Sequence, residues 1–483
     1  MLHKIKWILI YLLLLVISSV FVYKYQESQL PIKDKNHDFI DYSHIIISDM
    51  MSIYHIPSVQ MAIIEDGQIV FNIHQGLAHI KDENIVSKDT LYRSQSLTKT
   101  ITSVIIALLV EQEFLSLNDR LEMFLPLEFQ AEIPHYLKDK TIFELLTHQS
   151  GLHTGNYENV YDAWDNDLPD LMSSIISDVN IKPVDDTFSY SNVGYHFLEY
   201  VIEEVTDKTY DQVAHEFIFT PSDMGFSSFY YESDQVYAYG YDLHSKVVEH
   251  YQYAEKGSGG LLTTANDYAH FLIKLMNGEL ISQDNMSMLY ENTINDLGFY
   301  SHVYDSYGLG VFVEDVNNHT LLSHGGQGKG FMSYYQIDID SKSGFVILSN
   351  SQRAYPLIAL LSSSWNAYQH MDDPGISLIL DAINLVKFVN MLAIFIGLCA
   401  VIGILRKKWI RHKTVQSISL ILSIALMMFS IIGNAQEYQS VYVFIPLEYE
   451  RVMITLLIFS LVTYVYIMIS ILQTQTIKNL EGE

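Results

Sequence analysis

A serine and a lysine three residues apart, Ser96 and Lys99, have the clearest potential for chemistry in this sequence. The segment that follows, residues 97–114, contains no proline or glycine and is apolar almost all round, which is typical of a buried helix. A serine at its N-terminus would lie near free backbone N–H groups and the positive end of the helix dipole. A buried lysine one turn further on can lose its proton near neutral pH, because burial disfavours the charged form. The pair predicts an activated nucleophile; the alternative is a helix-capping serine followed by an ordinary surface lysine.

Two later segments supply groups that such a nucleophile needs. Tyr190 offers a phenol for proton transfer, and Asn192 offers an amide to hold a substrate carbonyl or to orient the lysine. An apolar strand pattern ends in His324 and is followed by glycines, where backbone can approach a ligand closely. We expect the backbone N–H of Gln327 to pair with that of Ser96 as an oxyanion hole.

The composition excludes several classes of function. The chain has 28 basic and 56 acidic residues, a net charge of −28, which argues against nucleic acid because a polyanion would be repelled. A single cysteine, Cys399, excludes an intrachain disulfide and a cysteine-based metal site. The histidines show no ligand spacing of the type found on metal-binding helices, so neither a metal nor another cofactor is expected.

The elements that must position these residues lie in a region of about 38–370. A strand hairpin is followed by a long, mostly helical middle, by further strands and by a final helix. Residues 156–185, which are polar, acidic and aromatic, are expected to be irregular, and the glycine-rich residues 257–260 are expected to form a loop. The order predicts an α+β fold, in which an antiparallel sheet is flanked by helices and carries an inserted all-helical subdomain.

Apolar segments at both ends of the chain predict membrane attachment. Residues 1–25 form either a secretory signal peptide or an uncleaved anchor, and we favour the anchor. Three apolar runs within residues 386–473 are each long enough to span a bilayer, and a tail of residues 474–483 follows. The loop between the first two runs is basic, and the loop between the last two has no basic residue. The positive-inside rule then predicts four spans, with both chain ends cytoplasmic and the 38–370 region outside.

The motifs, taken in order, resemble a known superfamily. Ser-x-x-Lys at 96–99, Thr-His-x-Ser-Gly-Leu at 147–152, Tyr-Ser-Asn at 190–192 and His-Gly-Gly at 324–326 resemble the serine β-lactamases and penicillin-binding proteins. The branch that they resemble most contains class C β-lactamases, low-molecular-weight D-Ala-D-Ala-type peptidases and related esterases. The resemblance implies that Ser96 is the acylated nucleophile and Lys99 the general base, with Tyr190 sharing proton transfer.

The resemblance also implies a set of binding groups. Asn192, His324 and Gly326 would contact substrate, and the backbone N–H groups of Ser96 and Gln327 would hold the oxyanion. Classical β-lactamases have Lys-Thr-Gly where this chain has a histidine and two glycines. A fixed cation thus becomes a titratable ring, which favours a peptidase or esterase over efficient β-lactam turnover.

The sequence therefore predicts a membrane-anchored extracytoplasmic serine hydrolase that acts through an acyl-enzyme on an amide or ester. The expected substrate is a D-amino-acid-containing cell-wall component or peptide, which would make the enzyme a D-aminopeptidase, carboxypeptidase or esterase. Two alternatives remain open, namely a non-catalytic cell-wall binding module or sensor, and a true class C-type β-lactamase. The sequence does not predict the oligomeric state.

Overall fold

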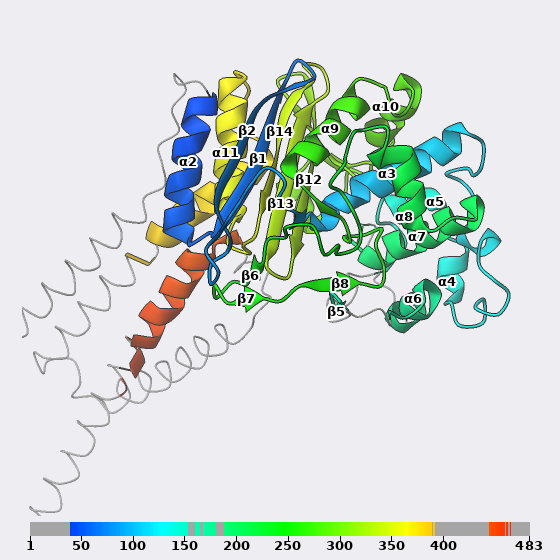
Figure 1. Cartoon of the computed structure of the whole chain (residues 1–483), viewed down its shortest axis with the longest axis horizontal. Coiled ribbons are helices and arrows are strands. Elements are labelled where there is room, and N and C mark those ends of the chain that lie inside the picture. The colour runs from blue at the N-terminus through cyan, green and yellow to red at the C-terminus, as the bar shows by residue number, and fades with distance from the viewer. Residues whose placement is uncertain are drawn as a thin grey trace, which may run out of the picture. The chain divides into compact units, whose positions relative to one another are not determined.

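The computed structural model describes residues 39–152, 160–164, 168–179, 188–388, 390–391, 444–458, 460–461 and 464 (Figure 1). The chain divides into two compact units. One unit is Ile32–Leu378, and the other combines Met1–Pro31 with Ile379–Glu483.

An eight-stranded antiparallel sheet forms the centre of the first unit, in the order β10-β11-β12-β13-β14-β1-β2-β3. Every residue of β13 and β14 is buried, which fits a sheet that is covered on both faces. The predicted hairpin is present, and its turn residues Asp66 and Gly67 both have positive φ, as a two-residue hairpin turn requires. The strands are β1 (Ser58–Glu65), β2 (Gln68–His79), β3 (Asn84–Ile85), β10 (Ser306–Tyr307), β11 (Phe312–Val316), β12 (His319–Gly328), β13 (Phe331–Asp338) and β14 (Ser343–Ser349).

Helices cover both faces of the sheet (Figure 1). On one face α2 (Phe39–Tyr54) packs against α11 (Tyr355–Tyr368), and the rings of Phe39 and Trp365 meet edge to face at 5.0 Å. On the other face α9 (Ala265–Met276) packs on β1, β2 and β14. The α9 helix begins where the Thr264 side chain accepts the N–H of Asp267, a typical N-cap. The predicted α+β architecture is therefore confirmed.

The chain between β3 and β10 is mostly helical. Its longest buried element is α3 (Thr98–Glu111), whose residues 98–109 are all buried. The other helices are α4 (His135–Lys138), α5 (Ile142–Leu146), α6 (Leu171–Val179), α7 (Asn192–Thr206), α8 (Tyr210–Ala214) and α10 (Gln283–Glu291). Three small sheets join β4 (Tyr92–Arg93) to β9 (Leu262–Thr263), β5 (Val160–Asp162) to β8 (Tyr251–Tyr253), and β6 (Gly240–Tyr241) to β7 (Val247–Val248).

The expectation that residues 156–185 are irregular is wrong for the part that the structure describes. Helix α6 and strand β5 both lie within this range. The helix forms because Met172 and Ile175, one turn apart, are both buried in the main core, and β5 pairs with β8.

No helix among the described residues is long and apolar enough to cross a membrane. The predicted anchor, residues 1–25, lies outside the described residues, as do the tail 474–483 and most of residues 386–473. Within the described part of that region, residues 446–458 are helical, and Lys387 lies 3.9 Å from Glu448. The four predicted spans therefore stay a prediction.

Candidate active site

Ser96 lies in a single 3-10 turn, η1 (Gln95–Leu97), between β4 and α3. Gln95, directly before it, has φ +52, a left-handed conformation that is uncommon for a residue with a side chain. The Gln95 amide is held on both sides, because it donates to the Tyr251 hydroxyl at 2.9 Å and accepts from the Tyr253 hydroxyl at 3.3 Å. The turn is thus fixed by its side-chain contacts, and Ser96 stands at its centre just before the helix begins.

Lys99 is fully buried, and its amine has three close neighbours. Nζ lies 2.7 Å from Oδ1 of Asn192 and 2.8 Å from the carbonyl oxygen of Ser258. The third neighbour is Oγ of Ser96, at 3.1 Å. Burial lowers the pKa of Lys99 well below its ordinary value, so the amine is held towards its neutral form.

These contacts fix the direction in which the neutral amine can accept a proton. A neutral amine has two N–H groups and one lone pair. The Asn192 and Ser258 oxygens can only accept, so they take the two N–H groups. The lone pair is then left for the hydroxyl hydrogen of Ser96, and Lys99 is placed as a general base.

A buried glutamate positions the Ser258 carbonyl. Oε2 of Glu199 accepts the backbone N–H groups of Lys256 at 2.6 Å and of Gly257 at 2.7 Å. Nε2 of His196 lies 2.8 Å from the hydroxyl of Ser258. Burial raises the pKa of Glu199 to about 8. The sequence predicts a loop here but gives it no part in the site.

Tyr190 lies beside this pair, with its ring centre 5.0 Å from Nζ of Lys99. Both of its chain neighbours are tied to His148, because the Ser189 N–H donates to the His148 carbonyl at 2.8 Å and the Ser191 N–H donates to Nδ1 at 3.1 Å. The ring of His148 also lies 4.3 Å from that of Tyr190. His148 therefore holds the loop that presents Tyr190, and its position is set by the left-handed φ of +58 at the end of α5.

Strand β12 lies directly against the turn that holds Ser96. A Cβ atom at Gly326 would lie 2.3 Å from the Ser94 carbonyl oxygen, and one at Gly328 would lie 2.3 Å from Cδ of Gln95. Only glycine allows this approach, which brings the backbone of residues 326–328 against the turn that holds Ser96. Their pairing as an oxyanion hole, and substrate contact at Gly326, stay predictions.

The glycines that follow His324 do not end the strand. Pairing of β12 with β13 continues to Gly328, whereas pairing with β11 stops at Ser323. Among the described strands, none lies beside β12 on that edge after Ser323. Backbone groups of this edge therefore face the side from which a substrate can pair with it.

His324 is buried, and both ring nitrogens have partners within the protein. Nδ1 lies 2.8 Å from the carbonyl oxygen of Gly325, and Nε2 lies 3.3 Å from the Tyr307 hydroxyl. Burial, reinforced by the nearby Lys99, lowers the pKa of His324 to about 3. The predicted loss of a fixed cation thus goes further than a titratable ring, because a His324 with this lowered pKa is neutral at pH 7. Its contact with substrate stays a prediction.

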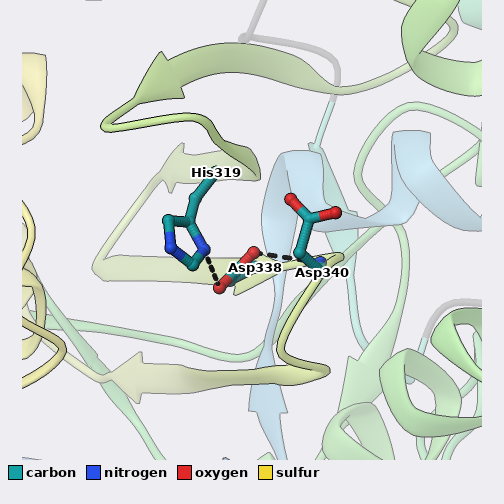
Figure 2. Close-up of side chains that lie close together, drawn as sticks. All are labelled: His319, Asp338 and Asp340. Carbon is teal, nitrogen blue, oxygen red and sulfur yellow. Dashed lines mark hydrogen bonds and ion pairs between the residues drawn. The ribbon is translucent and has the colours of Figure 1, made fainter.

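A cluster of possible metal ligands lies at the other end of β12. Figure 2 shows His319, Asp338 and Asp340, whose ligand atoms lie within 4.8 Å of one another. The carboxylate of Asp338 already accepts from Nδ1 of His319 at 2.9 Å, from Oγ of Ser341 at 2.6 Å and from the Asp340 N–H at 3.0 Å. The cluster thus provides hydrogen bonds for the turn that follows β13, and both carboxylate oxygens of Asp338 already have partners within the protein.

The structure brings Ser96, Lys99, Tyr190 and Asn192 together and places the glycine-rich end of β12 beside them. It adds Tyr307 and the Ser258 carbonyl, which sequence reasoning missed as parts of the site. The only sequence signal for them is the glycines that follow Tyr307 and those that flank Ser258.

Comparison with known proteins finds relatives of the same kind. The chain is 26% identical over 310 residues to "Protein flp" of Staphylococcus aureus (strain MW2), a match that covers 62% of this chain and 61% of that protein. It is 25% identical over 313 residues to penicillin-binding protein 4* of Bacillus subtilis (strain 168), covering 60% of this chain and 67% of the relative. The chain thus spans less than two thirds of the first of these relatives.

The fold has solved counterparts. The octameric penicillin-binding protein homologue from Pyrococcus abyssi superposes with a TM-score of 0.60 and 23% identity, covering 71% of this chain and 81% of that one. The family model described as Beta-lactamase matches residues 46–358, well over half of the chain, and this range contains every residue of the site. The chain therefore belongs to the Beta-lactamase family of serine hydrolases.

Proposed function

We propose that this protein is a serine hydrolase that forms an acyl-enzyme on Ser96. The observation that carries the proposal is the geometry of Lys99, whose buried amine has two oxygen acceptors and the Ser96 hydroxyl as its three neighbours. A lysine serving only the structure would be expected to lie against a carboxylate. Here the described neighbours of the amine are neutral, which favours the unprotonated base.

The geometry supports a two-step reaction. Lys99 takes the hydroxyl proton of Ser96 as Oγ attacks the substrate carbonyl carbon, and the backbone N–H groups of Ser96 and Gln327 stabilise the oxyanion that forms. The bond to the leaving group then breaks, and the leaving group takes a proton through Lys99 and Tyr190. Water hydrolyses the resulting ester, which releases the acid and restores the Ser96 hydroxyl.

The substrate that fits best is an extended, peptide-like amide or ester. The edge of β12 after Ser323 can pair with a backbone-like acyl chain. His324 is neutral and provides no cation for a substrate carboxylate, which makes efficient β-lactam turnover the less supported reading. Similarity to a penicillin-binding protein supports a substrate that contains a D-amino acid, from the cell wall or from a peptide.

We also propose that the hydrolase unit is held outside the cell membrane by four spans. The three apolar runs near the C-terminus and the basic loop between the first two support this arrangement. The alignment with the flp protein of Staphylococcus aureus strain MRSA252 covers 88% of this chain and 89% of the relative at 24% identity, so the likeness extends well beyond the hydrolase unit.

Intact-protein mass after incubation with a fluorophosphonate, and separately with a fluorescent penicillin, tests the proposal. We expect a fluorophosphonate adduct on the wild type and none on Ser96→Ala. Ser103→Ala is the matched control, because Ser103 is a buried serine on α3, the helix that follows Ser96, and its loss should leave the adduct intact. A penicillin adduct would favour D-alanyl substrates, and fluorophosphonate labelling alone would favour esters or capped peptides. A folded wild type that gives no adduct with either probe would contradict catalysis and favour a binding module.

A further inference from the structure

Two buried histidines are joined by one tyrosine beneath the proposed site. Nε2 of His148 lies 3.2 Å from the hydroxyl of Tyr307, and the same hydroxyl lies 3.3 Å from Nε2 of His324. All three side chains are buried. Tyr307 is not part of the reaction described above.

The partners at each end fix which nitrogen carries the proton. The Ser191 N–H can only donate, so Nδ1 of His148 accepts and the proton of this neutral ring is on Nε2. The Gly325 carbonyl can only accept, so the proton of His324 is on Nδ1. Both rings are held neutral, because burial lowers the pKa of His148 and of His324.

Each hydrogen-bond donor in the series His148–Tyr307–His324 then points in the same direction, from His148 towards His324. Nε2–H of His148 donates to the Tyr307 hydroxyl, and this hydroxyl donates to the unprotonated Nε2 of His324. A charged His324 would present a second donor to the Tyr307 hydroxyl, so the hydroxyl hydrogen would have to turn away from both histidines. The one-directional arrangement therefore agrees with Nε2–H at His148 and Nδ1–H at His324.

The hydrogen-bonded series His148–Tyr307–His324 connects the two sides of the proposed site. At one end His148 holds Ser189 and Ser191, the two neighbours of Tyr190. At the other end His324 is bonded to Gly325, two residues before the proposed oxyanion donor Gln327.

The backbone of Tyr307 is itself fixed. Its N–H and carbonyl groups both bond to Ile294 at 2.9 Å. A Cβ atom at Gly308 would lie 2.0 Å from the Leu289 carbonyl oxygen, and one at Gly310 would lie 2.1 Å from Oγ of Ser103. The segment that carries Tyr307 is therefore closely packed against its neighbours, which holds the hydroxyl in place between the two histidines.

We propose that Tyr307 is a positioning residue, whose hydroxyl completes the hydrogen bonds that hold His148 and His324 in opposite tautomers and thereby sets the spacing between Tyr190 and the oxyanion strand. Its hydroxyl does not touch the substrate in this role. The inference rests on the proposed acylation of Ser96 for its effect on rate, but the tautomers can be read without any reaction.

Nitrogen-15 NMR of the full-length protein, labelled at histidine, tests these tautomers directly. The two rings are assigned by the signals that disappear in His148→Gln and in His324→Gln. We expect an Nε2–H tautomer for His148 and an Nδ1–H tautomer for His324 in the wild type. In Tyr307→Phe we expect the His324 signals to shift towards a mixture of tautomers. The matched control is Tyr335→Phe, which removes another buried hydroxyl. That hydroxyl lies 3.0 Å from Oγ1 of Thr100 and is not part of the His148–Tyr307–His324 series, so its loss should change neither tautomer.

The rate of fluorophosphonate labelling tests the consequence for catalysis. A lost buried hydrogen bond predicts that Tyr307→Phe labels about tenfold more slowly, whereas Tyr335→Phe labels within about twofold of the wild type. His324→Gln keeps an acceptor near the Nε2 position and should label faster than His324→Leu. Should Tyr307→Phe fail to fold, this second comparison decides.

Three results would overturn the inference: unchanged tautomers in Tyr307→Phe, equal slowing in Tyr307→Phe and Tyr335→Phe, or equal rates for the Gln and Leu variants of His324. A wild type that shows both tautomers but is never labelled would contradict the proposed function instead.

Discussion

The amine of Lys99 lies closer to Asn192 than to Ser96, at 2.7 Å from Oδ1 of the amide and 3.1 Å from Oγ of the serine. This contact ties the first turn of α3 to the first residue of α7. The amide therefore aims the base, and its neutrality leaves the pKa of Lys99 low.

Replacing Asn192 with aspartate should shift the pH dependence of labelling to higher pH. A carboxylate beside the amine favours the charged form and raises the pKa of Lys99, so less neutral base is present at any given pH. The pH profile of fluorophosphonate labelling measures this shift. Asn192→Ala is the control, because it removes the acceptor without adding charge and should slow labelling without the alkaline shift. Superimposable profiles for Asn192→Asp and the wild type would contradict the assignment of Lys99 as the base.

Lys99→Arg should lose labelling at every pH between 6 and 9. A guanidinium stays protonated in this range and cannot accept the Ser96 proton, and general bases contribute about 10²- to 10⁴-fold. Lys140→Arg makes the same exchange at a lysine that pairs with Glu144, and it should label like the wild type. Substantial labelling of Lys99→Arg would show that another group takes the proton.

Gly326→Ala should damage both the fold around β12 and the labelling of Ser96. The new Cβ would lie 2.1 Å from Oγ of Ser333 and 2.3 Å from the Ser94 carbonyl oxygen, so the strand must move away from the nucleophile. We expect a lower melting temperature and a loss of labelling of at least about tenfold. At Gly225 an added Cβ meets nothing within 4 Å, so Gly225→Ala should be close to neutral. Equal behaviour of the two variants would remove the steric argument for the oxyanion strand.

Glu199→Gln should make stability less dependent on pH. Burial raises the pKa of Glu199 from 4.5 to about 8, so between these pH values the folded state binds a proton that the unfolded chain has released. The free energy of unfolding therefore falls with rising pH in this window, by up to about 1.4 kcal/mol per pH unit from this group.

The glutamine variant has no such proton, so its gain in melting temperature over the wild type should be larger at pH 8 than at pH 5. Exchange of the exposed Glu83 for glutamine provides the comparison, since it should produce no such difference. A difference in melting temperature between Glu199→Gln and the wild type that is the same at pH 5 and pH 8 would indicate that Glu199 is already ionised.

Local sequence patterns predict much of the scaffold. Apolar periodicity over residues 265–276 and a cap residue at Thr264 both indicate the helix that the structure shows as α9. The Asp66-Gly67 turn likewise marks the β1–β2 hairpin. Helix α2 was not anticipated, and β12 continues through the glycines to Gly328, because its pairing with β13 and its contact with η1 override the low strand propensity of glycine.

The proposed site is only partly readable in the sequence. Ser96 and Lys99 are one helical turn apart, so their spacing alone brings them together. The Ser258 carbonyl and the Tyr307 hydroxyl come from positions more than 150 residues away, and only the folded chain places them. Among 34 tyrosines, only the glycines that follow Tyr307 set it apart, and they do not show that it joins two histidines.

The first and last helices of the hydrolase unit, α2 and α11, pack on one another, and the first strand β1 pairs with the last strand β14. The two ends of the unit thus meet, and the pairing of β1 (Ser58–Glu65) with β14 (Ser343–Ser349) that joins them lies inside the sheet. Pulling the two ends apart would have to break the pairing of β1 with β14 before it could disturb the turn that holds Ser96. The same closure makes the unit a natural candidate for circular permutation, with new ends opened in an exposed turn and the old ones joined by a short linker.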